Sequence, residues 1–96
     1  MDHKQILKTA SDILAQRGKQ YGEVSDHFNR ISQIATALLG KQVTPYDVVM
    51  IFHCTKLTRM QESPSDIDHY VDGVNYLAFA GQFATKETKQ MDAENF

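Results

Sequence analysis

The sequence has few of the residues that mark secreted, membrane-spanning or nucleic-acid-binding proteins. Cys54 is its single cysteine, so an internal disulfide is excluded and a reducing cytoplasm is the expected location. Cys54 stands in an apolar run, which predicts a small buried side chain rather than a reactive thiol. No apolar run approaches the ~20 residues of a membrane span, and the N-terminus lacks a signal-peptide core. With a net charge of −2, general attraction to a nucleic-acid polymer is not expected.

The length and composition are those of a small globular domain. The chain has 96 residues, of which 42% are hydrophobic and 23% charged. We expect one helical domain over residues 1–84 and a polar tail over residues 85–96. A domain of this size buries a small share of its surface, so self-association into a homo-oligomer, a dimer or higher, is expected.

Apolar residues recur at helical spacing, and no segment alternates convincingly with the period of a strand. The first predicted helix covers residues 2–17 and is expected to stop at Gly18. The second covers residues 25–39 and is expected to stop at Gly40. The pattern therefore predicts an all-α protein.

Polar residues that accept backbone hydrogen bonds predict where the other helices begin. Ser25 or Asp26 is the expected cap of the second helix. The third start is the clearest, because Thr44 precedes Pro45 and is followed three residues later by Asp47. Since this helix opens with apolar residues on nearly all sides, we expect it to be the most buried.

The fourth helix is expected to begin after Ser63 or Ser65 and to fray after Phe83. All the connections are short, which favours antiparallel neighbours. The sequence thus predicts a compact bundle of about four antiparallel helices.

Two polar faces on the third and fourth helices are the first candidates for a binding site. Lys56 and Arg59 share one helix face, and Asp68, Asp72 and Tyr76 share another. In one interpretation they form only an interhelical ion-pair network. In the other they line a cavity, where arginine suits a phosphate because its planar group donates two parallel hydrogen bonds.

The turn KQYGEVSDHF, residues 19–28, is the second candidate. Tyr21 either packs on the core or stacks on a base, and His27 is expected to be an adaptable polar contact. Glu23 and Asp26 either offset the positive end of the second helix or contact a ligand. Arg17 and Lys19 would flank that ligand.

The four histidines, at positions 3, 27, 53 and 69, show no tight metal-ligand spacing. His53 stands on the apolar third helix and is expected to be a hydrogen-bonded core residue. No metal or other cofactor is therefore expected for a pure binding protein.

From about residue 6 to residue 83 the chain resembles a family of small, phage-borne helical domains of unassigned function. The matching positions are Tyr21, Gly22, Phe28, Ile31, Leu39, Gly40, Thr44, Pro45, Asp47, Val48, Lys56, Leu57, Arg59, Asp68, Asp72 and Tyr76. The chain departs from that family at His27, Ala35, His69 and Asn75, where Asn, Trp, Ser and Gly are usual. Because the departures fall near the expected site, a different ligand is implied.

The chain is also distantly similar to all-α nucleotide pyrophosphohydrolases of the MazG type, which hold magnesium between paired acids on two helices. A similar site here would use Glu23, Asp26, Asp68 and Asp72 as magnesium ligands. The E-x-x-E pair of that family is missing from the second helix, so pyrophosphate hydrolysis by this chain would need a rearranged site.

Three functions compete on this basis. The first is capture of a nucleotide-derived small molecule, in one version a host immune nucleotide signal sequestered in the host cytoplasm; it assigns no catalytic residue. Its binding residues would be Tyr21, His27, Lys56, Arg59, Asp68, Asp72 and Tyr76. The second is magnesium-dependent hydrolysis of nucleoside triphosphates, and the third is a structural or protein-interaction module. We expect binding rather than turnover.

Overall fold

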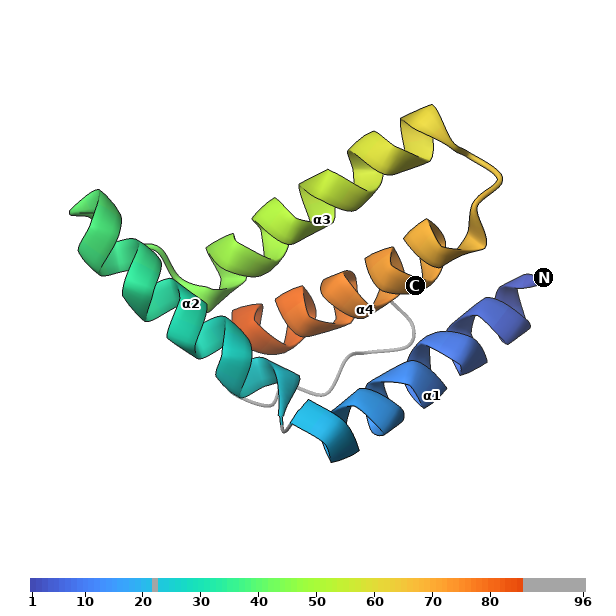
Figure 1. Cartoon of the computed structure of the whole chain (residues 1–96), viewed down its shortest axis with the longest axis horizontal. Coiled ribbons are helices and arrows are strands. Elements are labelled where there is room, and N and C mark those ends of the chain that lie inside the picture. Colours follow the sequence, from blue (N-terminus) through green and yellow to red (C-terminus); the bar gives the residue numbers. More distant parts are fainter. Residues whose placement is uncertain (22, 86–96) are drawn as a thin grey trace.

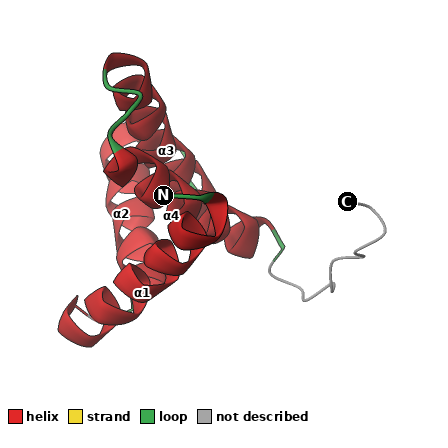
Figure 2. Ribbon diagram, turned by 90° about the vertical axis from the view of Figure 1, so that its right-hand side faces the viewer, coloured by secondary structure: helices red, strands yellow, loops and turns green. Residues whose placement is uncertain are grey.

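The computed structural model describes residues 1–21 and 23–85, which form four α-helices. They are α1 (His3–Tyr21), α2 (Val24–Leu39), α3 (Pro45–Glu62) and α4 (Ile67–Ala84). No strand occurs in this part of the chain (Figure 2), so the predicted all-α bundle is confirmed. Most of the predicted polar tail lies outside the described residues. None of the helices described is long and apolar enough to cross a membrane.

The helix α4 is the centre of the bundle. It forms an antiparallel pair with α3, while α1 lies along its other side (Figure 1). The helix α2 crosses the end of this pair where α3 begins and α4 ends. The end of α2 near Leu39 projects beyond the other helices in the same view.

Two of the predicted boundaries are confirmed by their capping geometry. Gly40 ends α2 in the left-handed region at φ 72°, a conformation that glycine adopts without steric cost. At the start of α3, Thr44 Oγ1 accepts a hydrogen bond from the Asp47 amide at 3.1 Å. Asp47 Oδ2 accepts one from the Thr44 amide at 3.0 Å, which completes the predicted capping box.

The predicted stop at Gly18 is wrong, because α1 continues through it to Tyr21. A glycine inside a helix weakens it by only about 0.5–1 kcal/mol relative to alanine, an amount that packing elsewhere in the helix overrides. A Cβ at Gly18 would meet no atom within 4 Å, so nothing in the fold requires glycine there.

Two predicted N-caps are also wrong. The N-cap of α2 is Glu23, which makes no side-chain capping bond, rather than Ser25 or Asp26. The N-cap of α4 is Asp66, whose Oδ1 accepts a hydrogen bond from the Asp68 amide at 3.1 Å. Ser63 was one candidate for that cap, but its amide donates to Arg59 O and it closes α3 instead.

The core is aromatic and centres on Phe28 of α2, which is 2% exposed. Its ring makes tilted edge contacts with those of Phe79, Phe52, Phe83 and Tyr76, at centroid distances of 5.4, 5.6, 6.3 and 6.4 Å. Such edge-to-face pairs contribute about 0.5–1.5 kcal/mol each beyond the area that they bury.

The expectation that α3 is the most buried helix is wrong, because α4 has four buried residues and α3 has three. Ile51 and Leu57 are exposed, and so is Cys54, which contradicts its predicted burial. His53 is buried as predicted, but its Nδ1 has no hydrogen-bond partner within the residues described.

Candidate functional site

A cleft of about 530 Å³ opens where the four helices converge, and we call it the central cleft. This volume falls in the range of about 300–1,000 Å³ that is usual for small-molecule sites. Its walls are formed by Leu14, Arg17, Glu23, Val24, His27, Phe28, Arg30, Phe52, Asp72, Asn75, Tyr76 and Phe79.

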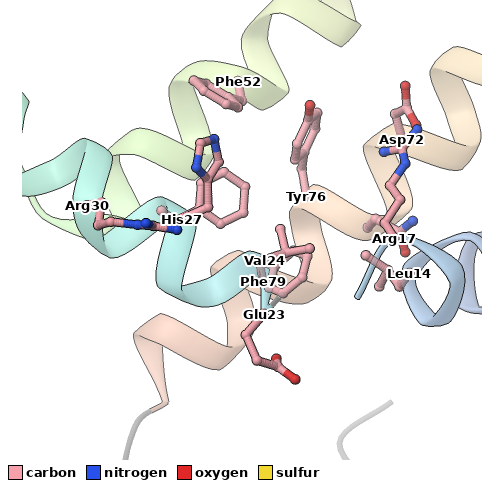
Figure 3. Close-up of a pocket in the computed structure, with 12 residues that line it drawn as sticks. Leu14, Arg17, Glu23, Val24, His27, Arg30, Phe52, Asp72, Tyr76 and Phe79 are labelled. Carbon is pink, nitrogen blue, oxygen red and sulfur yellow. The ribbon is translucent and has the colours of Figure 1, made fainter. Parts of the chain in front are cut away.

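The floor of the central cleft is the exposed side of the aromatic core. Phe52 and Tyr76 pack edge to face with their centroids 5.9 Å apart, one from α3 and one from α4. In Figure 3, Tyr76 and Phe79 lie between the polar side chains on either side of the cleft, and Phe52 lies beside His27. Partly buried aromatic faces of this kind offer a flat ligand a surface for stacking.

Positive charge reaches the central cleft from two different helices. Arg17 comes from the last part of α1, and Arg30 from the first half of α2 beside His27. In Figure 3, Arg30 and His27 lie on one side of the aromatic rings and Arg17 lies on the other. Neither arginine forms an ion pair with any residue in the described part of the chain.

Of the two acids on the cleft wall, Asp72 is already paired. Its Oδ2 lies 2.9 Å from Lys56 Nζ in a salt bridge. The side chain of Asp72 is 22% exposed and that of Lys56 is 13% exposed. The other acid, Glu23, is exposed at the start of α2. Counting partners among the described residues alone, the cleft therefore presents two unpaired guanidinium groups against one unpaired carboxylate.

Asn75 fixes the wall that α1 and α4 share. Its Nδ2 donates a buried hydrogen bond to the backbone carbonyl of Ala10 at 3.0 Å. Ala10 is 1% exposed, so this part of α1 is buried. Because the bond joins positions 65 residues apart in the sequence, no local pattern predicts it.

The structure brings together three of the seven predicted binding residues, namely His27, Asp72 and Tyr76. Lys56 pairs with Asp72 and does not itself line the central cleft. The side chain of Tyr21 lies outside the described residues, so its predicted stacking role stays a prediction.

Arg59 and Asp68 do not line the central cleft, although they lie on the predicted helix faces. The cleft lies at the end of the α3–α4 pair that α2 crosses. Arg59 comes seven residues after Phe52, which along a helix is about 10 Å further from the cleft. Both side chains are exposed. The structure therefore does not place Arg59 at the central cleft.

The ion-pair interpretation of the two polar faces is correct for one pair only. Among the described residues, Lys56–Asp72 is the one bridge that joins α3 to α4. Asp66 Oδ2 lies 3.4 Å from His69 Nε2 within the first turn of α4 and takes no part in it.

The acids of the magnesium alternative are not gathered into one site. Glu23 and Asp72 line the central cleft, whereas Asp26 and Asp68 do not. Within residues 1–21 and 23–85, no group of three or more His, Cys, Asp or Glu side chains is placed to hold a metal ion.

Arg30 is the charged cleft residue that the sequence interpretation missed. It follows His27 by three positions on α2, so the two share a helix face. That spacing could have identified it once His27 was chosen.

A profile of one protein family, described as "Domain of unknown function (DUF6378)", matches residues 5–84 of the chain. No curated protein and no solved structure matches it.

Proposed function

The chain belongs to the DUF6378 family, whose function is unknown, and we propose that it captures a nucleotide-derived small molecule in the central cleft without hydrolysing it. One observation carries the proposal. Two arginines without ion-pair partners in the described chain flank an aromatic floor, inside a cleft of about 530 Å³.

The aromatic floor supports binding of a nucleobase. Tyr76 and Phe52 are half-buried, so each is held by the core on one side and borders the cleft on the other. Stacking of a base on such a ring is worth about 1–3 kcal/mol. The neighbouring Glu23 carboxylate is an acceptor for base or ribose donors.

The two arginines support recognition of phosphate. A guanidinium group donates two parallel hydrogen bonds to a phosphate and stays charged at every physiological pH. Because Arg17 and Arg30 lie on opposite sides of the rings (Figure 3), they suit a ligand with phosphates at both ends. Cyclic dinucleotides, which carry two phosphodiesters on opposite sides of one ring, have a comparable arrangement.

We favour capture over hydrolysis because the carboxylates are too few at the cleft. Magnesium in nucleotide hydrolases is held by several oxygen ligands in near-octahedral geometry. Glu23 is the one cleft acid that is not already paired with a lysine in the described chain. The resemblance to phage-borne domains supports a particular version of capture, namely sequestration of a host immune nucleotide signal in the host cytoplasm.

We also propose that the chain self-associates through the projecting part of α2. Ile34 and Leu38 are 68% and 80% exposed, and they stand four residues apart on one face of the helix. A short apolar stripe of this kind can pack against its own copy about a two-fold axis. Sedimentation velocity should show an oligomer that Leu38→Ser dissociates, whereas a wild-type monomer at high concentration would contradict self-association.

A thermal-shift screen tests the capture proposal. The protein is heated with cyclic dinucleotides, cyclic ADP-ribose isomers and nucleoside triphosphates, each with and without magnesium. A ligand that binds only the folded state raises the melting temperature in proportion to RT ln(1 + [L]/Kd). We expect one nucleotide class to do so, and the same molecule to be recovered intact after heat denaturation.

Two results would contradict capture. Release of pyrophosphate or of a cleaved product that disappears in Asp72→Asn would support the pyrophosphohydrolase alternative. Absence of stabilisation by every nucleotide would favour the third function, a structural module in which the cleft wall is only an internal ion pair.

A further inference from the structure

The two sides of the central cleft differ in the positive charge that they offer. His27 and Arg30 line one side, and Arg17 lines the other (Figure 3). Asp72 lies on the side of Arg17 in the same view, where Lys56 forms a salt bridge with it. One side therefore offers an arginine and a histidine together, and the other offers a single arginine beside an acid that is already paired.

His27 and Arg30 are neighbours on the surface of α2. They stand three positions apart, a spacing that places two Cβ atoms about 5–6 Å from each other on a helix. Both residues are exposed and line the cleft, so a ligand in the cleft can reach them. Neither forms a salt bridge within the described part of the chain. Their donors are therefore available to one anionic group.

The acids of the protein do not occupy this side of the cleft. Glu23 lines the cleft, but its side chain points away from His27 and Arg30 in Figure 3. Asp26 precedes His27 in the sequence and does not line the cleft. From α3, the cleft wall receives Phe52 and no charged residue. An anion beside His27 and Arg30 therefore meets two donors from α2 and no described carboxylate.

A terminal phosphate matches this pair of donors better than a phosphodiester does. A phosphate monoester carries about −1.5 to −2 charges at pH 7 and has three strong acceptor oxygens. A phosphodiester carries a single negative charge and has fewer free oxygens. A guanidinium group alone can satisfy two oxygens of a phosphate, so a second cationic donor gains most when a further charged oxygen is present.

Given the nucleotide capture proposed above, on which this step rests, we propose that His27 makes the central cleft selective for a terminal phosphate monoester. The ligand class is then a linear dinucleotide with a 5′ phosphate rather than a cyclic one. The terminal phosphate binds between His27 and Arg30, a base stacks at Tyr76, and the internal phosphodiester lies toward Arg17. A cyclic dinucleotide has only phosphodiesters and leaves the second donor unused.

Isothermal titration with ApA, pApA and cyclic di-AMP tests this selectivity. All three carry two adenine bases and differ in their phosphates. ApA has a single phosphodiester, pApA adds a 5′ phosphate monoester, and cyclic di-AMP has phosphodiesters only. We expect pApA to bind at least about tenfold more tightly than ApA or cyclic di-AMP, as charge-assisted hydrogen bonds to the added phosphate predict.

His27→Gln and His3→Gln form a matched pair of variants. Both histidines are exposed, so both variants should fold normally. His27→Gln keeps a hydrogen-bond donor but cannot carry a charge, so it should weaken pApA binding about fivefold and change ApA binding less than about twofold. His3 lies at the start of α1 and does not line the cleft, so His3→Gln should bind pApA as the wild type does.

Methyl phosphate and dimethyl phosphate test the phosphate site without a base. At equal concentrations, methyl phosphate should shift the ring-nitrogen NMR signals of His27 more than dimethyl phosphate does. The signals of His3 should respond equally to both compounds. Because this measurement needs no stacking, it separates a failure of the phosphate site from a failure of nucleotide capture.

Three results would overturn the selectivity of His27. Equal affinities for pApA and ApA would remove it while leaving nucleotide capture in place. Binding of pApA that His27→Gln does not weaken would assign the phosphate to other residues. Equal effects of methyl phosphate and dimethyl phosphate on His27 would show no preference for the monoester. In contrast, a His27 response to methyl phosphate without binding of any of the three dinucleotides would support the phosphate site and contradict their capture.

Discussion

Lys56 Nζ lies 2.9 Å from Asp72 Oδ2 and joins α3 to α4 beside the central cleft. The pair uses the lysine and the aspartate that the sequence offered as ligand contacts. Free positive charge at the cleft therefore comes from Arg17 and Arg30, on the two helices that flank this pair. Asp72 thus belongs both to a structural ion pair and to the wall of the central cleft.

Breaking this pair should destabilise the fold. Lys56→Met leaves the Asp72 carboxylate mostly buried without its partner, at a cost of about 1–3 kcal/mol. Chemical denaturation measures the loss. The double variant Lys56→Met/Asp72→Leu should recover part of it, because an apolar pair leaves no buried charge. Lys8→Met is the control, since Lys8 pairs with Asp12 on the exposed face of α1 and should change stability little. Equal effects of Lys56→Met and Lys8→Met would contradict the structural role of Lys56.

Asn75→Ala should loosen α1. The variant removes the one side-chain hydrogen bond that joins α1 to α4 in the described chain, from Asn75 Nδ2 to Ala10 O. We expect a loss of about 1–3 kcal/mol in the free energy of unfolding. Hydrogen exchange should show the largest loss of protection in α1. Gln82→Ala, an exposed change on the same helix, should stay within about 0.5 kcal/mol of the wild type. Uniform loss of protection in all four helices would contradict a local role for Asn75.

Gly18→Ala and Gly40→Ala should have opposite effects on stability. Gly18 lies inside α1 with open space around it, so alanine should stabilise the protein by about 0.5–1 kcal/mol. Gly40 has φ 72°, where a Cβ costs roughly 1–2 kcal/mol. Thermal unfolding of both variants measures the difference. A lower melting temperature for Gly18→Ala would show that α1 does not continue through Gly18.

The sequence predicted those helix boundaries that local chemistry determines. Thr44 and Asp47 satisfy each other's backbone groups within four residues, and Gly40 needs only its own conformation. The predicted helix end at Gly18 was wrong because local propensity does not include the tertiary packing that lets the helix continue. The fourth cap was misplaced because serines and Asp66 offered several acceptors within a few residues.

The sequence predicted which helix faces the candidate site uses, but not how far along each helix the site extends. Helical spacing placed Asp72 and Tyr76 on one face of α4 correctly, yet the same spacing also selected Asp68 and Arg59. Only the crossing of α2 over one end of the α3–α4 pair decides which of these residues meet a cavity. That crossing depends on Phe28 entering the aromatic core, a contact between distant parts of the chain.

Isothermal titration of Arg30→Gln with the nucleotide that most stabilises the wild type tests the central claim most directly. Arg30 is exposed and forms no ion pair in the described chain, so the variant should fold normally. Loss of a charge-assisted contact of about 1.5–3 kcal/mol predicts an affinity reduced roughly tenfold to a hundredfold. Lys41→Gln, which removes a charge outside the cleft, should bind as the wild type does. Unchanged affinity in Arg30→Gln, or an equal loss in Lys41→Gln, would contradict nucleotide capture in the central cleft.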